Sequence, residues 1–111
     1  MNRAERGRAG ENAAAALLEA HGYRIIARNV RVPGGEMDAV CFDGPTLVIV
    51  EVKRRDSHRF GSALGAVDGR KKATLRRIAG DYAQFVAPSA PIRFDVVTID
   101  GSQLRLHRNA F

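Results

Sequence analysis

The spacing of apolar residues along the chain predicts two helices and five strands. Residues 4–20 and 68–86 carry apolar side chains at helical intervals, and they are followed by Gly22 and Pro88, residues that commonly end helices. Short apolar runs typical of strands follow the first helix three times and the second helix twice, at residues 23–30, 37–42, 46–53, 92–99 and 103–108. The predicted order is therefore helix, three strands, helix, two strands.

The second and third predicted strands are joined by Asp43-Gly44-Pro45, which is typical of a hairpin turn. If the turn is centred between Gly44 and Pro45, opposed residues have numbers that sum to 89. Val40 then faces Ile49, and Asp38 faces Glu51. The hairpin is therefore predicted to place two carboxylates side by side.

A lysine is predicted to join this pair, because Lys53 lies two residues after Glu51 and the period of two along a strand places both on one face. Adjacent carboxylates repel each other, and a divalent cation between them would remove the repulsion. Ligands that are all oxygen suit Mg²⁺ or Mn²⁺ better than Zn²⁺, and a neighbouring lysine can stabilise developing charge or orient a water. The alternative is a carboxylate–lysine ion pair on a solvated sheet face. The apolar run 47–50 favours the metal site, because an unpaired carboxylate in a buried strand is costly.

The same residues carry a resemblance to known proteins. An Asp on one strand, followed by an apolar strand that ends in Glu51-Val52-Lys53, resembles the PD-(D/E)XK nuclease superfamily. No proline directly precedes Asp38, so the chain departs from the literal superfamily pattern. Within the superfamily, the chain resembles the YraN-like family of small uncharacterised bacterial proteins, related to archaeal Holliday junction resolvases, at Gly10-Glu11, 35–38, 47–54 and 93–97.

The resemblance implies an α/β fold of the restriction-endonuclease type, with a mixed sheet flanked by helices in the order α-β-β-β-α-β-β. We expect one domain over residues 1–111. Spacing places Glu11 on the inward face of the first helix, and the resemblance implies that it joins Asp38 and Glu51 at the metal. The alternative for Glu11 is a carboxylate favoured near a helix N-terminus by the helix dipole.

Two further predictions concern the core. Asp95 alternates with Phe94 and Val96 in an apolar strand, so we expect it to serve as a structural partner for an arginine or a backbone group. The second helix is expected to bury one apolar stripe, formed by Leu75, Ile78, Ala79, Tyr82, Phe85 and Val86.

The excess of basic residues indicates a polyanionic partner. The chain has 18 Lys and Arg against 12 Asp and Glu, a net charge of +6, and nine of its cations lie between Lys53 and Arg77. A cluster of cations next to a metal site is what binding to a phosphate backbone requires, whereas the alternative is a solvated charged face. The predicted nucleic-acid contacts are Arg54, Arg55, Arg59, Arg70, Lys71 and Lys72.

The lone Cys41, the lack of a secretory pattern and the lack of a long apolar run predict a cytoplasmic protein without a membrane partner. The leading hypothesis is a Mg²⁺- or Mn²⁺-dependent endonuclease of the Holliday-junction-resolvase type acting on structured DNA. Asp38, Glu51, Lys53 and Glu11 would form its catalytic site. The alternative is a DNA- or RNA-binding module, or an assembly factor, that keeps the nuclease fold without turnover. By analogy with resolvases we also expect a homodimer.

Overall fold

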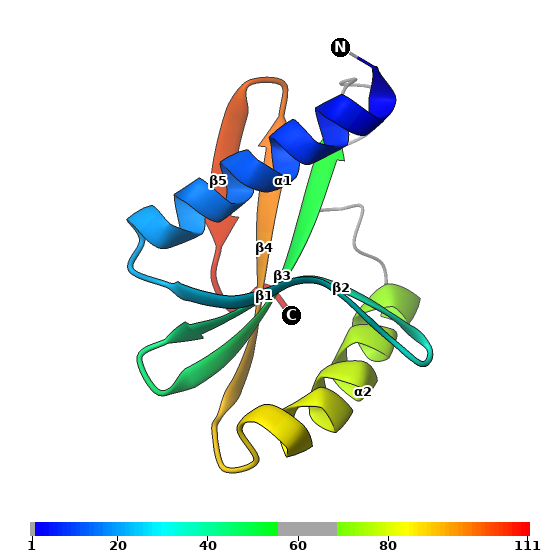
Figure 1. Cartoon of the computed structure of the whole chain (residues 1–111), viewed down its shortest axis with the longest axis vertical. Helices are drawn as coiled ribbons and strands as arrows, with labels where there is room; N and C mark the ends of the chain where they lie inside the picture. The colour runs from blue at the N-terminus through cyan, green and yellow to red at the C-terminus, as the bar shows by residue number, and fades with distance from the viewer. Residues whose placement is uncertain (1, 56–68) are drawn as a thin grey trace.

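A computed structural model describes residues 2–55 and 69–111 (Figure 1). Its elements follow the predicted order and confirm the mixed α/β fold. They are helix α1 (Arg3–Ala20), strands β1 (Arg24–Val32), β2 (Gly35–Asp43) and β3 (Thr46–Arg55), helix α2 (Gly69–Val86), and strands β4 (Ile92–Asp100) and β5 (Gln103–His107). Neither helix within these two ranges is apolar enough over its length to cross a membrane.

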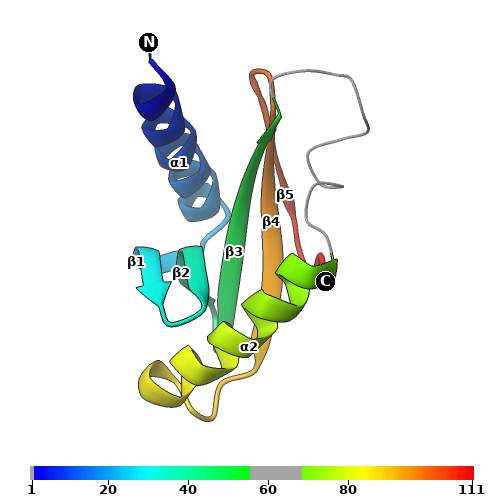
Figure 2. The ribbon, with the colours of Figure 1, turned by 90° about the vertical axis from the view of Figure 1, so that its right-hand side faces the viewer.

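The five strands form one sheet in the order β1-β2-β3-β4-β5. Neighbouring strands are antiparallel except β3 and β4, which run parallel. A parallel pair needs a crossover connection, and α2 lies in the chain between these two strands. Figure 2 shows α1 beside the upper part of the sheet and α2 across its lower part.

The pairing of β2 with β3 has the register predicted from the turn. Val40 pairs with Ile49 and Phe42 pairs with Leu47, so the paired numbers sum to 89. Alternate residues of β3 enter two separate cores, because Val48 packs with α1 residues while Ile49 packs with α2 residues. The two helices therefore cover opposite faces of the sheet.

Helix α1 approaches the sheet closely at Gly10. The helix begins at a capping box in which the Asn2 side chain accepts a hydrogen bond from the Glu5 backbone N–H, and Glu5 bonds back to the Asn2 backbone. Gly10 is buried, and a Cβ atom there would lie 2.9 Å from Nη2 of Arg54 and 3.2 Å from Cδ1 of Ile99. A side chain at this position would require the Arg54 guanidinium and the Ile99 side chain to shift, so Gly10 favours the close approach of α1 to the ends of β3 and β4.

Helix α2 buries a shorter stripe than predicted. Ile78, Ala79 and Ala83 are buried, but Phe85 is 88% exposed and Val86 is 41% exposed, so the prediction that these last two residues enter the core was wrong. Helical spacing fixes the direction in which a side chain points. It does not determine whether the sheet extends far enough to cover that side chain.

Asp95 has the structural role predicted for it. Its carboxylate is fully buried and accepts hydrogen bonds from Nε of Arg93 at 2.9 Å, the Tyr23 hydroxyl at 2.6 Å and the Asn109 backbone N–H at 2.9 Å. Burial on its own would raise the pKa of Asp95, but these hydrogen bonds outweigh it and hold the pKa below its ordinary value. The buried charge is therefore fully compensated, and it ties β4 to the start of β1 and to the chain after β5.

Asp95→Asn is expected to lower the free energy of unfolding by about 3 kcal/mol at neutral pH, because it leaves the Arg93 guanidinium underpaired in a buried network. Chemical denaturation with urea measures the change. Asp43→Asn is the matched control: Asp43 also binds Arg93, at 2.9 Å, but its side chain is 31% exposed, so the expected loss is below about 1 kcal/mol. Equal losses in the two variants would contradict the assignment.

Candidate functional site

The carboxylates of Asp38 and Glu51 meet where the pairing of β2 with β3 ends. The last paired residues on that side are Ala39 and Val50, one position short of the predicted pair. The Asp38 side chain instead crosses to β3, where Oδ2 accepts a hydrogen bond from the Val52 backbone N–H at 2.8 Å. The two carboxylates are therefore close to each other, as predicted. At this position, however, β2 is joined to β3 by the Asp38 side chain and not by backbone pairing of Asp38 with Glu51.

Asp38 departs from the alternation that the sequence analysis assumed. Met37 and Val40 both pack into the α2 core although they are three residues apart, so the period of two is broken between them. Asp38 lines a cavity together with Val52, which packs toward α1 as Val48 and Val50 do, while Glu51 points toward α2. The prediction that Asp38, Glu51 and Lys53 lie on one face of the hairpin is therefore wrong for Asp38. Its side chain leaves β2 where the alternation is broken, and its carboxylate interacts with that of Glu51 from this position.

The environment of Asp38 disfavours its charged form. The pKa of Asp38 is raised to about 7, chiefly by burial and next by the nearby Glu51 carboxylate, while the Val52 N–H and the Lys71 ammonium oppose the rise. An ordinary aspartate has a pKa of 3.8. The two carboxylates therefore repel each other when both are ionised, and the Lys71 ammonium and the Val52 N–H offset this repulsion only in part.

Glu51 is the more deeply buried partner, with 3% of its surface exposed. Its Oε1 atom lies 3.2 Å from Nζ of Lys53 and 3.3 Å from Nζ of Lys71. Its Oε2 atom is buried and has no hydrogen-bond partner among the residues that the structure describes. The predicted placement of Lys53 beside Glu51 is thus confirmed. The alternative, a carboxylate–lysine ion pair, is also present, but its Glu51 carboxylate is buried and does not lie on a solvated face.

This donor set fits a divalent cation. The group comprises two adjacent carboxylates, and one of them has a buried oxygen without a hydrogen-bond donor among the described residues. Hard cations such as Mg²⁺ take oxygen ligands. Mg²⁺ keeps several waters when it binds, so two protein carboxylates with waters and a phosphate are an adequate ligand set. Asp38 and Glu51 are the residues that could hold it.

Glu11 reaches the same region from α1. It lines a cavity of about 170 Å³ together with Gly7, Gly10, Asp38 and Arg54. Its Oε2 atom accepts a hydrogen bond from Nδ2 of Asn29 at 3.4 Å. Within residues 2–55 and 69–111, no group of three His, Cys, Asp or Glu side chains lies close enough together to hold a metal ion. The centre of three carboxylates is therefore not assembled in this structure, and the metal role of Glu11 stays a prediction.

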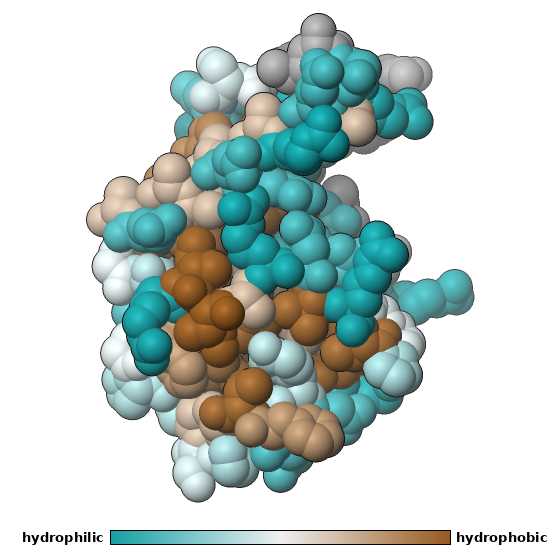
Figure 3. All heavy atoms as spheres, viewed as in Figure 1, coloured by the Kyte–Doolittle hydropathy of each residue, from teal (hydrophilic) through white to brown (hydrophobic). Residues whose placement is uncertain are grey.

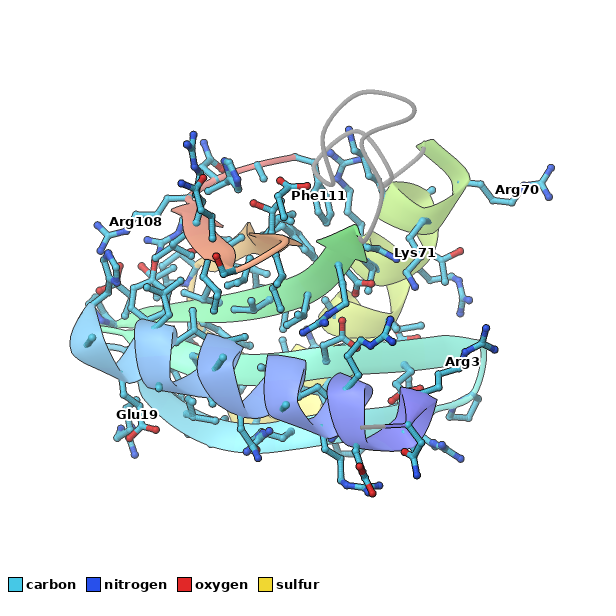
Figure 4. The ribbon with its side chains drawn as sticks, turned by 90° about the horizontal axis from the view of Figure 1, so that it is seen from above. Arg3, Glu19, Arg70, Lys71, Arg108 and Phe111 are labelled. Atoms are coloured by element: carbon cyan, nitrogen blue, oxygen red, sulfur yellow. The ribbon has the colours of Figure 1, made fainter. Side chains whose placement is uncertain are left out.

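The basic residues named from the sequence divide into separate groups. Lys71 contacts the carboxylate pair, whereas Nζ of Lys72 lies 5.8 Å from the centre of the Phe111 ring. Figure 4 shows Arg70 extending away from the protein at the same end of the molecule as Lys71 and Arg3. In Figure 3 hydrophilic surface covers the region where α1 begins, and apolar surface gathers lower in the view. Arg59 and the side chain of Arg55 lie outside the described part of the chain, so their predicted contacts stay predictions.

The contact of Lys71 with Glu51 was missed by sequence reasoning, which assigned Lys71 to the predicted nucleic-acid contacts. No local spacing links the two residues, because one lies on β3 and the other in the first turn of α2. The only signal in the sequence was the start of a basic helix after the carboxylate strand. The packing of α2 on the sheet is what turns that signal into a contact.

The raised pKa of Asp38 predicts how the stability of the metal-free protein depends on pH. Between about pH 4 and pH 7 the folded protein binds more protons than the unfolded chain, so the free energy of unfolding falls as the pH rises through this window. The expected loss is on the order of 3 kcal/mol. Urea denaturation in EDTA at several pH values measures it.

Asp38→Asn is expected to flatten that pH dependence, since an amide does not titrate in this range but still accepts the bond from Val52. The control Glu36→Gln removes an exposed carboxylate of the same strand, which lies 4.0 Å from Nε of Arg31, and should leave the pH dependence unchanged. A wild-type protein whose stability rises between pH 4 and pH 7 would contradict the assignment.

Comparison with known proteins identifies the family of this chain. Residues 10–99 match the uncharacterised protein family UPF0102. A UPF0102 protein of Symbiobacterium thermophilum is 49% identical over 111 residues, which cover 95% of this chain and 94% of the relative. A UPF0102 protein of Thermodesulfovibrio yellowstonii is 39% identical over 111 residues, covering 100% of this chain and 99% of the relative. The resemblance to the YraN-like family is confirmed, and the chain belongs to the UPF0102 family.

Proposed function

We propose that this protein is a Mg²⁺- or Mn²⁺-dependent endonuclease that cleaves a phosphodiester bond in structured DNA. One observation carries the proposal: the buried Oε2 atom of Glu51 has no donor among the described residues and lies in a carboxylate pair with Asp38. A protein that needed Glu51 only for an ion pair would have no use for the second carboxylate, which raises the electrostatic cost of the pair. A cation bound between the two carboxylates would remove their repulsion.

Each residue of the site would have a distinct role in the reaction. Asp38 and Glu51 would hold the metal, and Glu11 would approach from α1 through the cavity that it shares with Asp38. A bound divalent cation supplies Lewis acidity at the phosphate and lowers the pKa of a bound water. Lys53, 26% exposed and next to Glu51, would stabilise the negative charge that develops on the phosphate or orient the attacking water.

The basic residues support a nucleic-acid substrate. Arg54 lines the cavity beside Asp38, and Arg70 extends from the first turn of α2 near Lys71 (Figure 4). Cations on both sides of the carboxylate pair would neutralise the phosphates that flank the scissile bond. This binding would be electrostatic, so it would position the substrate without reading its sequence.

A second candidate is a nucleic-acid-binding module without turnover. The observation that favours it is the pairing of both lysines with Oε1 of Glu51, which compensates much of the buried charge without a metal. The two candidates predict different responses to divalent cations.

Mn²⁺ is expected to raise the melting temperature of the wild-type protein, because a ligand that binds only the folded state stabilises it by about 2.7 kcal/mol at a hundredfold excess over Kd. Asp38→Asn should abolish the Mn²⁺-dependent rise. In EDTA at pH 8 it should melt at or above the wild-type temperature, since it removes the repulsion with Glu51. A structural role for Asp38 predicts the reverse, a variant destabilised in EDTA and a wild type unaffected by Mn²⁺.

Cleavage is expected on a four-way or flap DNA substrate in Mg²⁺ or Mn²⁺, and not in EDTA. The assay compares duplex, single-stranded, flap and four-way DNA at equal concentrations. Glu51→Gln should lower the rate by at least about a hundredfold, because it removes the charge that holds the metal. The control Glu36→Gln, an exposed carboxylate on β2, should retain the wild-type rate. Binding without cleavage of any substrate would favour the module without turnover.

A further inference from the structure

Two lysines share a single oxygen of Glu51. Nζ of Lys53 and Nζ of Lys71 lie 3.2 Å and 3.3 Å from Oε1, while Oε2 has no hydrogen-bond partner among the described residues. A carboxylate that only needed neutralising would offer one oxygen to each ammonium, because that arrangement separates the two like charges. Here the two cations lie close to one oxygen, and the second, buried oxygen is left for another ligand.

The two lysines are held differently. Lys53 follows Glu51 on the same strand, and its side chain is 26% exposed. Lys71 reaches the site from the first turn of α2, and its side chain is 42% exposed. Figure 4 shows Lys71 directed from α2 toward the end of β3. Because a lysine ammonium sits on a flexible four-carbon stem, Lys71 can leave Glu51 for solvent without a movement of the backbone.

A divalent cation and the Lys71 ammonium compete for Glu51. An ion held between Asp38 and Glu51 would lie within a few ångströms of Nζ of Lys71, and charges of like sign at that distance repel strongly at a partly buried site. We infer that Lys71 is a positioning residue that acts as a stand-in cation: its ammonium holds the buried Glu51 carboxylate in place in the metal-free protein and gives way when a divalent metal binds. The inference rests on the metal centre of the proposed function and adds to it the residue that keeps the centre formed when it is empty.

Lys71→Met is expected to tighten Mn²⁺ binding about tenfold, the scale set by removing one such charge in a water-like dielectric. Isothermal titration of the full chain with Mn²⁺ measures the Kd, with no nucleic acid present. In EDTA the variant should melt below the wild type, because Glu51 has lost one of its cations, and Mn²⁺ should close that gap. A purely structural ion pair predicts the lower melting temperature in EDTA but no gain in Mn²⁺ affinity and no closing of the gap.

Two controls match this variant. Lys72→Met removes the neighbouring charge of the same helix turn, whose ammonium lies over the Phe111 ring, and should leave the Mn²⁺ affinity unchanged. Lys71→Arg keeps the charge and should keep the wild-type affinity. Lys71→Gln serves as a second neutral variant if Lys71→Met does not fold.

The outcomes separate the inference from the proposed function. If neutral variants at Lys71 bind Mn²⁺ more tightly than the wild type and Lys72→Met does not, the stand-in role is supported, even where wild-type binding is too weak to measure. If the wild type and the neutral variants bind Mn²⁺ with equal affinity, the stand-in role is overturned and the metal centre stands. If neither the wild type nor any variant binds Mn²⁺, both are overturned.

Discussion

The burial of Glu51 is the constraint on which the site depends. A carboxylate with 3% of its surface exposed needs compensating charge, and the structure supplies it from two directions, with Lys53 from the same strand and Lys71 from α2. The need for Lys71 in turn links the first turn of α2 to the end of β3. The position of that helix is therefore tied to the electrostatics of the site as well as to the apolar core beneath it.

A buried and a half-buried carboxylate in the same sheet show opposite solutions to this problem. Asp95 accepts hydrogen bonds from an arginine, a tyrosine and a backbone N–H, and its pKa is lowered. Asp38 accepts one bond from a backbone N–H and lies beside another carboxylate, and its pKa is raised to about 7. The first arrangement stabilises the fold. The second costs stability, which is common where a group is kept for binding or chemistry.

The shape of the region follows from residues that lack side chains. Gly10 allows α1 to lie against Arg54 and Ile99, and with Gly7 it leaves the cavity in which Glu11 and Asp38 both take part. A larger residue at Gly10 would require the Arg54 side chain to move from its place beside the cavity. The approach of α1 thus brings a helix carboxylate and an arginine to the cavity beside the carboxylate pair of the strands.

The sequence by itself determined the order of elements, the register of the β2–β3 hairpin, and the placement of Lys53 beside Glu51. These features depend on local periodicity and on one turn, which act over a few residues. Tertiary structure decided the rest. The break in alternation at Asp38, the exposure of Phe85 and the contact between Lys71 and Glu51 all depend on where a distant element comes to lie. Spacing along a chain gives the direction of a side chain, whereas the packing of helices on the sheet decides what that side chain meets.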